Sequence, residues 1–362
     1  MFYINKIDKG GAERVITNLS NYFCENNHVI LVTTNKGDIK YPIDKQVKFL
    51  SLKSNKIIDK ISKISIIKYF SLRNIIKKEK PDIVISFLPE AGFRIAALKR
   101  FSKYMRNIPL IISIRNNPYV EYKKTLINKL MCFLYKKIDG LVVQTPDCLE
   151  YFKDILSCDM TIIPNPLSTR FLNKKMPRER RNEIVTVNRL TDAKNPFMMV
   201  KAFEKFLLNH PKYHLTMYGD GVLKNEIKDY IIEKELQEKI TLAGNVDDIE
   251  NKIVDAKMYV LCSNYEGMPN SLLEALALGI PSIATDSPIG GCRMLIKDGV
   301  NGLLIPVGDV DALVNSMDKI ANDNKMADKM SMEARKVVIE YSPITINKKW
   351  EDYIFKFIKK GR

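Results

Sequence analysis

Short, unbroken apolar runs alternate along this chain with longer segments of helical spacing. The runs are rich in Val and Ile and show no polar alternation, which is typical of parallel strands covered on both faces. In the first half the predicted strands are Phe2–Lys6, Val29–Thr33, Asp82–Phe87, Leu110–Ile114, Leu141–Gln144 and Thr161–Ile163. In the second half they are Ile184–Asn188, His214–Tyr218, Ile240–Ala243, Met258–Cys262, Ser282–Ala284 and Gly302–Ile305. Strands that alternate with helices predict an α/β fold with doubly wound parallel sheets.

The length of the chain predicts two domains, because 362 residues exceed what one hydrophobic core usually supports. The polar, proline-flanked stretch Pro164–Arg181 is the natural linker. We therefore expect one Rossmann-like domain over residues 1–165, a second over 166–342 and a last helix within 343–362. Ligands of such sheets bind beyond the carboxyl ends of the strands, so the pattern predicts a binding cleft between the two domains.

The net charge of +16 is concentrated in the first half. Residues 1–165 hold 28 Lys and Arg against 15 Asp and Glu, a net +13, whereas residues 166–362 hold 30 against 27, a net +3. Much of the excess lies in Lys53–Lys80, where lysines and isoleucines recur at helical spacing. Two interpretations stay open: a face that lies on anionic lipid headgroups, or an ordinary solvated helix face. We find no nucleic-acid-binding motif and expect no nucleic-acid partner.

The cysteine pattern and the hydropathy favour a protein of the cytoplasm. The six cysteines are scattered and form no C-x-x-C pair, which is typical of small core residues in a reducing compartment. No apolar run approaches the roughly 18 residues of a membrane span, and the first residues lack the apolar core of a signal peptide. The first predicted strand begins at residue 2, which leaves open a start upstream of Met1.

The segment EGMPNSLLE places Glu266 and Glu274 around a turn that follows a predicted strand. Pro269 suits the first turn of a helix, and Asn270 or a serine suits its cap. Backbone amides at this helix start, strengthened by the helix dipole, would form an anion cradle on Met268, Asn270, Ser271 and Leu272. Carboxylates grip sugar hydroxyls, so the pair favours a diphosphate ligand with a sugar on each side, a nucleotide sugar. Alone, two such glutamates are more commonly a helix-start acid and an exposed helical residue.

Three further strand ends strengthen this interpretation. Arg189 and Lys194 lie on one strand-to-helix loop in NRLTDAKNP, where a guanidinium fork and an ammonium can neutralise a diphosphate. The next two predicted strands end in Gly219-Asp220-Gly221 and Gly244-Asn245-Val246, whose glycines permit tight turns. Each signal is weak by itself, but their order on successive strands indicates one site at one edge of a sheet.

With these motifs the sequence resembles the retaining glycosyltransferases of family four, which have the GT-B fold of two Rossmann-like domains. The resemblance covers nearly the whole chain and is densest over residues 184–310. It rests on the E-x7-E pair and NRLTDAKNP, and on YGDG at Tyr218–Gly221, LAGNV at Leu242–Val246, DGVNGLLIPVGD at Asp298–Asp309 and GGAER at Gly10–Arg14. The run RNNP at Arg115–Pro118 is similar to that of members that extend bacterial surface glycans such as O-antigen, capsule or lipopolysaccharide.

The resemblance implies a role for each matched residue. Glu274 would bind the ribose and Glu266 the transferred sugar, while Arg189 and Lys194 would hold the diphosphate and stabilise its leaving charge. Arg115 would touch the phosphate or sugar of the donor, with a structural ion pair as the alternative. Further expected contacts are Gly10 and Gly11 for the acceptor or diphosphate, Asn245 and Val246 near the base, and Gly219, Gly267, Met268, Pro269, Asn270 and Ser271 along the donor.

The resemblance also implies the reaction: a hexose or N-acetylhexosamine moves from a nucleoside diphosphate sugar, in particular a UDP-sugar, to a lipid-linked glycan. Front-face attack would retain the configuration, and no metal or other cofactor is expected, since none of the three histidines lies in a metal-ligand pattern. The last helix would cross back to the first domain, and the enzyme would work on the inner face of the cytoplasmic membrane.

The sequence departs from the family pattern at two places. No histidine follows Leu110–Ile114, and Arg293-Met294 stand where an acidic residue is common, which weakens any inference about the donor sugar. Two alternatives stay open: a sugar-nucleotide epimerase on the same fold, and a module that binds lipid or nucleotide without catalysis.

Overall fold

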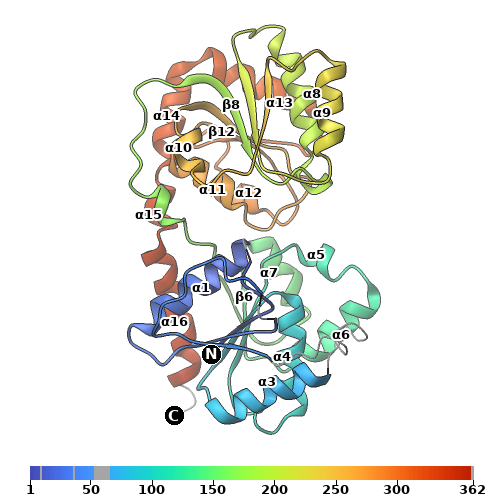
Figure 1. Cartoon of the computed structure of the whole chain (residues 1–362), viewed down its shortest axis with the longest axis vertical. Coiled ribbons are helices and arrows are strands. Elements are labelled where there is room, and N and C mark those ends of the chain that lie inside the picture. The colour runs from blue at the N-terminus through green and yellow to red at the C-terminus, as the bar shows by residue number, and fades with distance from the viewer. Residues whose placement is uncertain (9, 36, 53–65, 360–362) are drawn as a thin grey trace. The chain divides into compact units, whose positions relative to one another are not determined.

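A computed structural model describes residues 1–8, 10–35, 37–52 and 66–359. The contacts divide the chain into two compact units: unit 1 is Met1–Asn165 with Ile346–Arg362, and unit 2 is Pro166–Thr345. Each unit contains one parallel sheet with helices on its faces (Figure 1). The predicted fold class is therefore confirmed, and each unit is described by itself below.

Unit 1 contains a seven-stranded parallel sheet in the order β3-β2-β1-β4-β5-β6-β7. Its strands are β1 (Phe2–Ile4), β2 (Ile30–Thr33), β3 (Lys48–Ser51), β4 (Val84–Phe87), β5 (Leu110–Ser113), β6 (Gly140–Val143) and β7 (Asp159–Ile162). Its helices are α1 (Gly11–Cys24), α3 (Ile66–Glu79), α4 (Pro89–Phe101), α5 (Pro118–Glu121), α6 (Thr125–Tyr135), α7 (Pro146–Lys153) and most of α16 (Pro343–Lys359). The strand order reverses between β1 and β4, which is where ligands bind in doubly wound sheets.

Edge strand β3 is the one described strand that the hydrophobic pattern did not predict. Its residues are exposed or half-buried, and Lys48 pairs with Glu79 on α3 at 2.7 Å. Because an edge strand is covered on fewer sides, KFLS lacks the continuous apolar run of its buried neighbours.

The predicted basic stretch Lys53–Lys80 falls partly on residues 53–65, which lie outside the described residues. The remainder forms α3, which buries Leu72 and Ile76. On another side of this helix, Arg73 and Lys77 lie 5.0 and 5.3 Å from the centre of the Tyr104 ring. The interpretation of this stretch as a lipid-binding face stays a prediction.

Helix α16 completes unit 1 from the far end of the sequence. Trp350 is fully buried, and its ring stacks on Phe87, at the end of β4, with 5.6 Å between centroids. The hydroxyl of Tyr353 donates a hydrogen bond of 2.7 Å to the carbonyl oxygen of Asp159 on β7. The last helix thus packs against β4 and β7 of unit 1.

Unit 2 contains a six-stranded parallel sheet in the order β10-β9-β8-β11-β12-β13. Its strands are β8 (Arg181–Val187), β9 (His214–Tyr218), β10 (Ile240–Gly244), β11 (Ala256–Leu261), β12 (Ser282–Thr285) and β13 (Leu303–Ile305). Its helices are α8 (Pro196–Leu207), α9 (Lys224–Glu233), α10 (Ile249–Ile253), α11 (Asn270–Ala277), α12 (Gly291–Leu295), α13 (Val310–Asn322), α14 (Asn324–Ala334) and α15 (Val337–Glu340), with 3-10 turns η1 (Thr169–Phe171) and η2 (Asp192–Lys194). The strand order reverses between β8 and β11, so loops after these strands flank the switch point.

No helix among the described residues is both long enough and apolar enough to cross a bilayer.

Candidate active site

The loop after β8 places two cations at the carboxyl edge of the unit 2 sheet. Arg189 is exposed, and no described carboxylate lies within 4 Å of its guanidinium. Lys194 ends the turn η2, and Asn195 follows it in a left-handed conformation with φ of 44°. The side chain of Asn195 caps α8 by accepting a hydrogen bond of 3.3 Å from the amide of Met198. This sharp turn fixes where Lys194 points.

The loop after β11 brings Glu266 directly against Lys194. Glu266 is buried and accepts hydrogen bonds from the ammonium of Lys194 and, at 2.7 Å, from the hydroxyl of Ser263. The two loops are also joined through Asn264, whose amide donates to Ala193 O at 2.9 Å and whose side chain donates to Asp192 O at 2.7 Å. Removing one member of a buried ion pair leaves the charge of the other uncompensated. We therefore expect the loss of either Lys194 or Glu266 to destabilise this arrangement of the two loops.

Helix α11 begins beside this ion pair, as the sequence predicted, but the expected cap is wrong. Pro269 occupies the N-cap position, and no described side chain caps the helix. The start of α12 approaches the loop so closely that a Cβ on Gly291 would overlap the carbonyl oxygen of Gly267. Glycine at 291 therefore allows the turn between Glu266 and α11 to lie against a second helix start.

Glu274 lies one turn inside α11, where it is half-buried. Beneath it, Tyr259 of β11 donates a hydrogen bond of 2.8 Å to Ser271 Oγ. Burial raises the pKa of Tyr259 above its ordinary value, and the charges of Glu266 and Glu274 raise it further. Tyr259 thus stays a neutral donor that fixes the first turn of α11. The sequence analysis missed it, because a tyrosine inside an apolar strand carries no local signal of a partner.

A pocket of about 240 Å³ opens beside these loops at the ends of β8, β9 and β10. It is lined by Val187, Asn188, Arg189, Tyr218, Gly219, Gly244, Asn245, Val246 and Ile249. Gly219 has φ of +124°, and a Cβ there would overlap the carbonyl oxygen of Asn188, so only glycine fits. The buried Oδ1 atom of Asn188 has no hydrogen-bond partner among the described residues and is thus available to a ligand donor.

The structure thus gathers most of the predicted donor contacts on one edge of unit 2. Arg189, Gly219, Asn245 and Val246 share a pocket, while Lys194, on the same loop as Arg189, forms an ion pair with Glu266 of the loop after β11. The role of each residue toward a ligand stays a prediction. Arg293, which departs from the family pattern, pairs with Asp286 at 2.8 Å.

The remaining predicted residues belong to unit 1. Gly10 caps the start of α1 without a side-chain hydrogen bond, and its carbonyl accepts from the hydroxyl of Tyr41 at 3.1 Å. Gly11 is the first residue of that helix. The approach of a ligand to either glycine stays a prediction.

Arg115 is buried at the end of β5, and the alternative of a structural ion pair is wrong. No described carboxylate lies within 4 Å of its guanidinium, which donates one hydrogen bond of 2.9 Å to Asn165 Oδ1. The guanidinium lies 4.8 Å from the ring centre of Phe87 and 5.5 Å from that of Trp350. Its Nε and Nη2 atoms have no partner among the described residues, and burial lowers the pKa of Arg115 to about 9.

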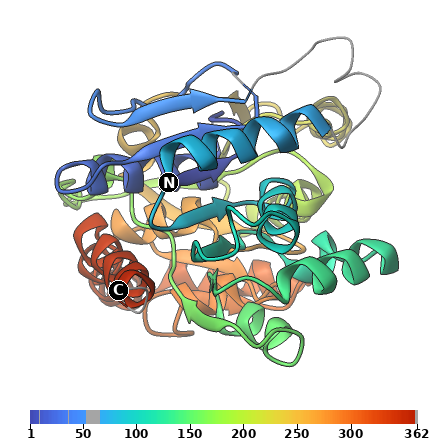
Figure 2. The same ribbon diagram turned by 90° about the horizontal axis from the view of Figure 1, so that it is seen from below.

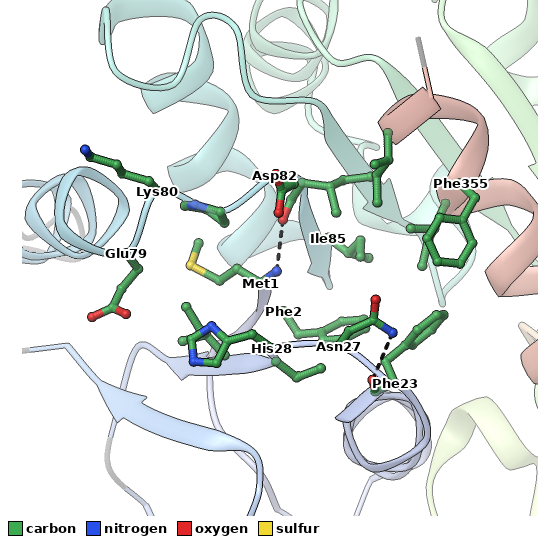
Figure 3. Close-up of a pocket in the computed structure, with 16 residues that line it drawn as sticks. Met1, Phe2, Phe23, Asn27, His28, Glu79, Lys80, Asp82, Ile85 and Phe355 are labelled. Carbon is green, nitrogen blue, oxygen red and sulfur yellow. Dashed lines mark hydrogen bonds between the residues drawn. The ribbon is translucent and has the colours of Figure 1, made fainter. Parts of the chain in front are cut away.

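A separate cavity of about 180 Å³ lies at the amino ends of β1, β2 and β4 (Figure 3). The amino group of Met1 donates there to Ile83 O at 2.9 Å, and burial lowers the pKa of that amino group to about 5. None of the predicted site residues lines this cavity, and ligands of parallel sheets bind at the opposite edge. Among the described residues, no group of three or more His, Cys, Asp and Glu gathers as a metal site would require.

Two parallel-sheet units, with cations and helix starts at the strand ends of the second, define the GT-B class of glycosyltransferases. The profile described as Glycosyltransferase Family 4 matches residues 9–171, and that described as Glycosyl transferases group 1 matches residues 168–337. The chain therefore belongs to this glycosyltransferase family, and it is a transferase enzyme.

Curated relatives align over long stretches. The chain is 28% identical over 353 residues, 96% of each protein, to the GalNAc-alpha-(1->4)-GalNAc-alpha-(1->3)-diNAcBac-PP-undecaprenol alpha-1,4-N-acetyl-D-galactosaminyltransferase of Campylobacter jejuni. It is 28% identical over 291 residues to the UDP-Gal:alpha-D-GlcNAc-diphosphoundecaprenol alpha-1,3-galactosyltransferase of Escherichia coli, covering 74% of this chain and 73% of that enzyme.

Solved structures share the fold at low identity. Anabaena Alr3699/HepE in complex with UDP superimposes with a TM-score of 0.83 at 15% identity, covering 98% of this chain and 99% of that one. Sucrose-phosphate synthase from Thermosynechococcus elongatus gives a TM-score of 0.83 at 16% identity, covering 99% of both chains. These likenesses confirm the GT-B fold.

Proposed function

We propose that this enzyme transfers a hexose or N-acetylhexosamine from a UDP-sugar to a polyprenyl diphosphate-linked glycan, with retention of configuration. The observation that carries the proposal is the arrangement at the carboxyl edge of unit 2: a pocket lined by Arg189, whose guanidinium has no described carboxylate within 4 Å, and, on the loops after β8 and β11, the Lys194–Glu266 ion pair and the start of α11. The Campylobacter and Escherichia relatives are both named for acceptors linked to undecaprenyl diphosphate, which supports this acceptor class.

The donor would lie along that edge from base to sugar. The base would enter the pocket of Gly219, Asn245 and Val246, where the free Asn188 Oδ1 can accept a hydrogen bond from it. The ribose hydroxyls would donate to Glu274, one turn inside α11. The solved complex of HepE with UDP, and the UDP-Gal in the name of the Escherichia relative, support uridine as the base.

The diphosphate would lie between Arg189 and the start of α11. Arg189 offers a planar fork without a competing carboxylate, and the helix start offers backbone amides with the positive end of the helix dipole. The ammonium of Lys194 has three N–H donors, so it would donate a hydrogen bond to a phosphate oxygen as well as to Glu266. Glu266 would then accept from the hydroxyls of the transferred sugar.

The reaction follows from these positions. The bond between the anomeric carbon and the phosphate oxygen breaks while the acceptor oxygen bonds to the same face of that carbon. The acceptor proton passes to the departing phosphate oxygen, so the products are the extended glycan and UDP. Arg189, Lys194 and the α11 dipole meet the charge of the leaving diphosphate, and the mechanism that we propose therefore uses no metal ion.

The acceptor class suggests where the enzyme works. A polyprenyl diphosphate lies at the surface of the cytoplasmic membrane, and the glycan on it would belong to an O-antigen, capsule or lipopolysaccharide. An epimerase on the same fold is the second candidate; it would turn over its sugar nucleotide without any acceptor. The transferase names of the relatives favour the first.

A transfer assay tests the proposal. Purified enzyme is given UDP-glucose, UDP-galactose, UDP-GlcNAc or UDP-GalNAc with a polyprenyl diphosphate-linked sugar, with and without EDTA, and products are followed by mass spectrometry and NMR. We expect an α-linked product from one donor and no loss of rate in EDTA. Turnover of the donor without an acceptor would favour the epimerase, and an inverted linkage would overturn the front-face mechanism.

A further inference from the structure

Exposed apolar side chains of unit 1 form a ridge on helix α6. Leu126 is 79% exposed, and Leu130 and Phe133 are each 44% exposed. They recur at i, i+4 and i+7, so they share one face of the helix. The opposite face is buried against the body of unit 1 through Met131, Leu134 and Tyr135. Figures 1 and 2 both show α6 at the outer side of unit 1, and it contacts α4.

The ridge continues onto the end of α4. Phe101 is 66% exposed, and its ring centroid lies 6.3 Å from that of Phe133. Arg100 lies 3.7 Å over the ring of Phe133 and donates a hydrogen bond of 3.3 Å to its carbonyl oxygen. These contacts hold the two phenylalanines together as one apolar surface.

Lysines border this surface and no acid interrupts it. Residues 122–138 contain no Asp or Glu, and their five exposed lysines are Lys123, Lys124, Lys129, Lys136 and Lys137. None of the five has a described carboxylate within 4 Å. By helical geometry Lys129 lies along one side of the ridge, and Lys136, the C-cap residue of α6, continues that side, while Lys123 and Lys124 precede the first turn. Lysine stems can lie on an apolar surface while their ammonium groups reach lipid phosphates.

We propose that the α6 ridge, defined as Leu126, Leu130, Phe133 and Phe101 with the bordering lysines, docks on an anionic lipid bilayer. An apolar ridge flanked by unpaired cations is the pattern of a helix that lies in the headgroup boundary. Two copies of this chain in face-to-face contact would oppose their lysines, so charge favours lipid over self-association. The inference rests on the proposed function, which requires the enzyme to meet a lipid-linked acceptor.

The position of the ridge fits that requirement. Helix α5 follows the carboxyl end of β5, and three residues separate α5 from α6. On α5, Tyr119 is 58% and Val120 is 49% exposed, so apolar exposure extends from α6 toward the sheet edge where ligands bind. We assign no lipid contact to the groove beside α3. The residues that precede α3 in the sequence, 53–65, lie outside the described part of the chain.

Vesicle co-sedimentation tests the ridge. Vesicles of phosphatidylcholine are compared with vesicles in which a third of the lipid is phosphatidylglycerol. We expect binding to the anionic vesicles that weakens with salt. Leu126→Ser with Leu130→Ser, and separately Lys129→Glu with Lys136→Glu, should each lower the partition coefficient about tenfold or more. Matched controls on unit 2 are Leu208→Ser, at a leucine that is 84% exposed, and Lys201→Glu with Lys228→Glu, at exposed lysines.

Each outcome decides the proposal. Equal partition of the α6 variants and the wild type would overturn it, as would wild-type binding that ignores lipid charge. A wild-type dimer that Leu126→Ser with Leu130→Ser dissociates would assign the ridge to a second copy instead. Unchanged melting temperature and UDP binding in the variants would show that they fold. Transfer to a short, water-soluble acceptor should remain, and its absence in the wild type would contradict the proposed function while leaving the vesicle result to decide the ridge.

Discussion

The carboxyl edges of the two sheets differ in how completely their polar groups are paired. At the edge of unit 2, Glu266 has two hydrogen-bond donors, and Asn264 joins two loops through two bonds. Along the matching edge of unit 1, buried polar groups have no partner among the described residues: Ser86 Oγ, Ser113 Oγ, Gln144 Nε2, and Nε and Nη2 of Arg115. They belong to β4, β5 and the turns that follow β5 and β6.

This difference bears on the order of binding. A buried donor without a partner costs about 1–3 kcal/mol, so the edge of unit 1 carries a free energy cost that a polar ligand would remove. At the edge of unit 2, by contrast, the loops that carry Lys194 and Glu266 are held by their own hydrogen bonds, and the unpaired polar atom that we find there among the described residues is Asn188 Oδ1 in the pocket. The comparison therefore favours a prearranged donor site in unit 2 and an acceptor edge in unit 1 that a ligand completes.

The largest effect is expected at the ion pair. Glu266→Gln should lower kcat about a hundredfold or more while UDP binding changes little, because the carboxylate is assigned to the transferred sugar and not to the nucleotide. The matched control is Asp311→Asn, which removes a carboxylate from the exposed 2.7 Å pair with Lys205 elsewhere on unit 2. Steady-state kinetics and UDP calorimetry on both variants measure this; a kcat for Glu266→Gln equal to that of the control would contradict the assignment.

Two arginines sharpen the comparison between the units. Arg189→Ala should lower kcat/KM about thirtyfold to a hundredfold, with partial recovery in Arg189→Lys, since the fork is lost but a charge remains. Arg115→Met should keep or raise the melting temperature, because removing a buried charge without a counter-ion relieves its desolvation.

If Arg115 also meets a ligand phosphate, Arg115→Met lowers kcat/KM about tenfold despite its stability. Kinetics and thermal unfolding of the three variants check this pair of expectations. A strongly destabilised Arg115→Met would show that the guanidinium is a structural element, and full activity in Arg189→Ala would remove Arg189 from the site.

Two glycines line the pocket in unit 2, and we expect the pocket to depend more on Gly219 than on Gly244. Gly219→Ala should destabilise the protein by about 3 kcal/mol and abolish UDP binding, because the backbone of Asn188 blocks a Cβ and φ is +124°. Gly244 also has a positive φ, +67°, but no described atom lies within 4 Å of the position of an added Cβ. Gly244→Ala is therefore expected to lower the free energy of unfolding by about 1 kcal/mol. Urea unfolding and UDP titration compare the two, and equal losses would place the strain elsewhere.

The smallest effect is expected in the labelling of buried cysteine thiols, which reports on the opening of each unit separately. Burial raises the pKa of Cys148 in unit 1 and of Cys262 and Cys292 in unit 2 to about 12. UDP at ten times its Kd should slow labelling of Cys262 and Cys292 about tenfold and leave Cys148 unchanged, if each unit opens by itself. Peptide mass spectrometry after labelling measures this, and equal protection of all three would mean that the units open together.

The same thiols set a pH dependence. In the unfolded chain they lose their protons near pH 9, and in the folded chain near 12. The folded state therefore binds more protons between these values, and the contribution of the thiols to stability is complete below pH 9 and is lost as the pH rises toward 12. Cys292→Ala should flatten the decline measured by urea unfolding.

Much of the fold could be predicted from the sequence because buried parallel strands are continuous apolar runs. The same rule failed at β3, whose edge position leaves KFLS half-exposed. Strand ends also predicted which residues share an edge of unit 2. The Lys194–Glu266 ion pair could not be predicted, since it depends on the left-handed turn at Asn195 and on hydrogen bonds between two loops.

Arg115 shows a second limit. Its surroundings include Trp350, which α16 brings from the other end of the chain, so no local pattern reveals the stacked guanidinium. The charge pattern directs attention to Lys53–Lys80, whose role stays a prediction, and it does not reveal the exposed apolar ridge on α6. Which side chains of α6 remain exposed depends on how α6 packs against α4 in the folded unit, and the sequence alone does not show that packing.

Calorimetric titration of UDP in the presence of EDTA tests the central claim most directly, because a prearranged donor site in unit 2 must bind the nucleotide alone. We predict saturable UDP binding to the wild type, much weaker binding of GDP and ADP, and loss of UDP binding in Glu274→Ala but not in Glu233→Ala, at the end of α9. Equal UDP affinity in both variants, or no nucleotide binding by the wild type, would contradict the account.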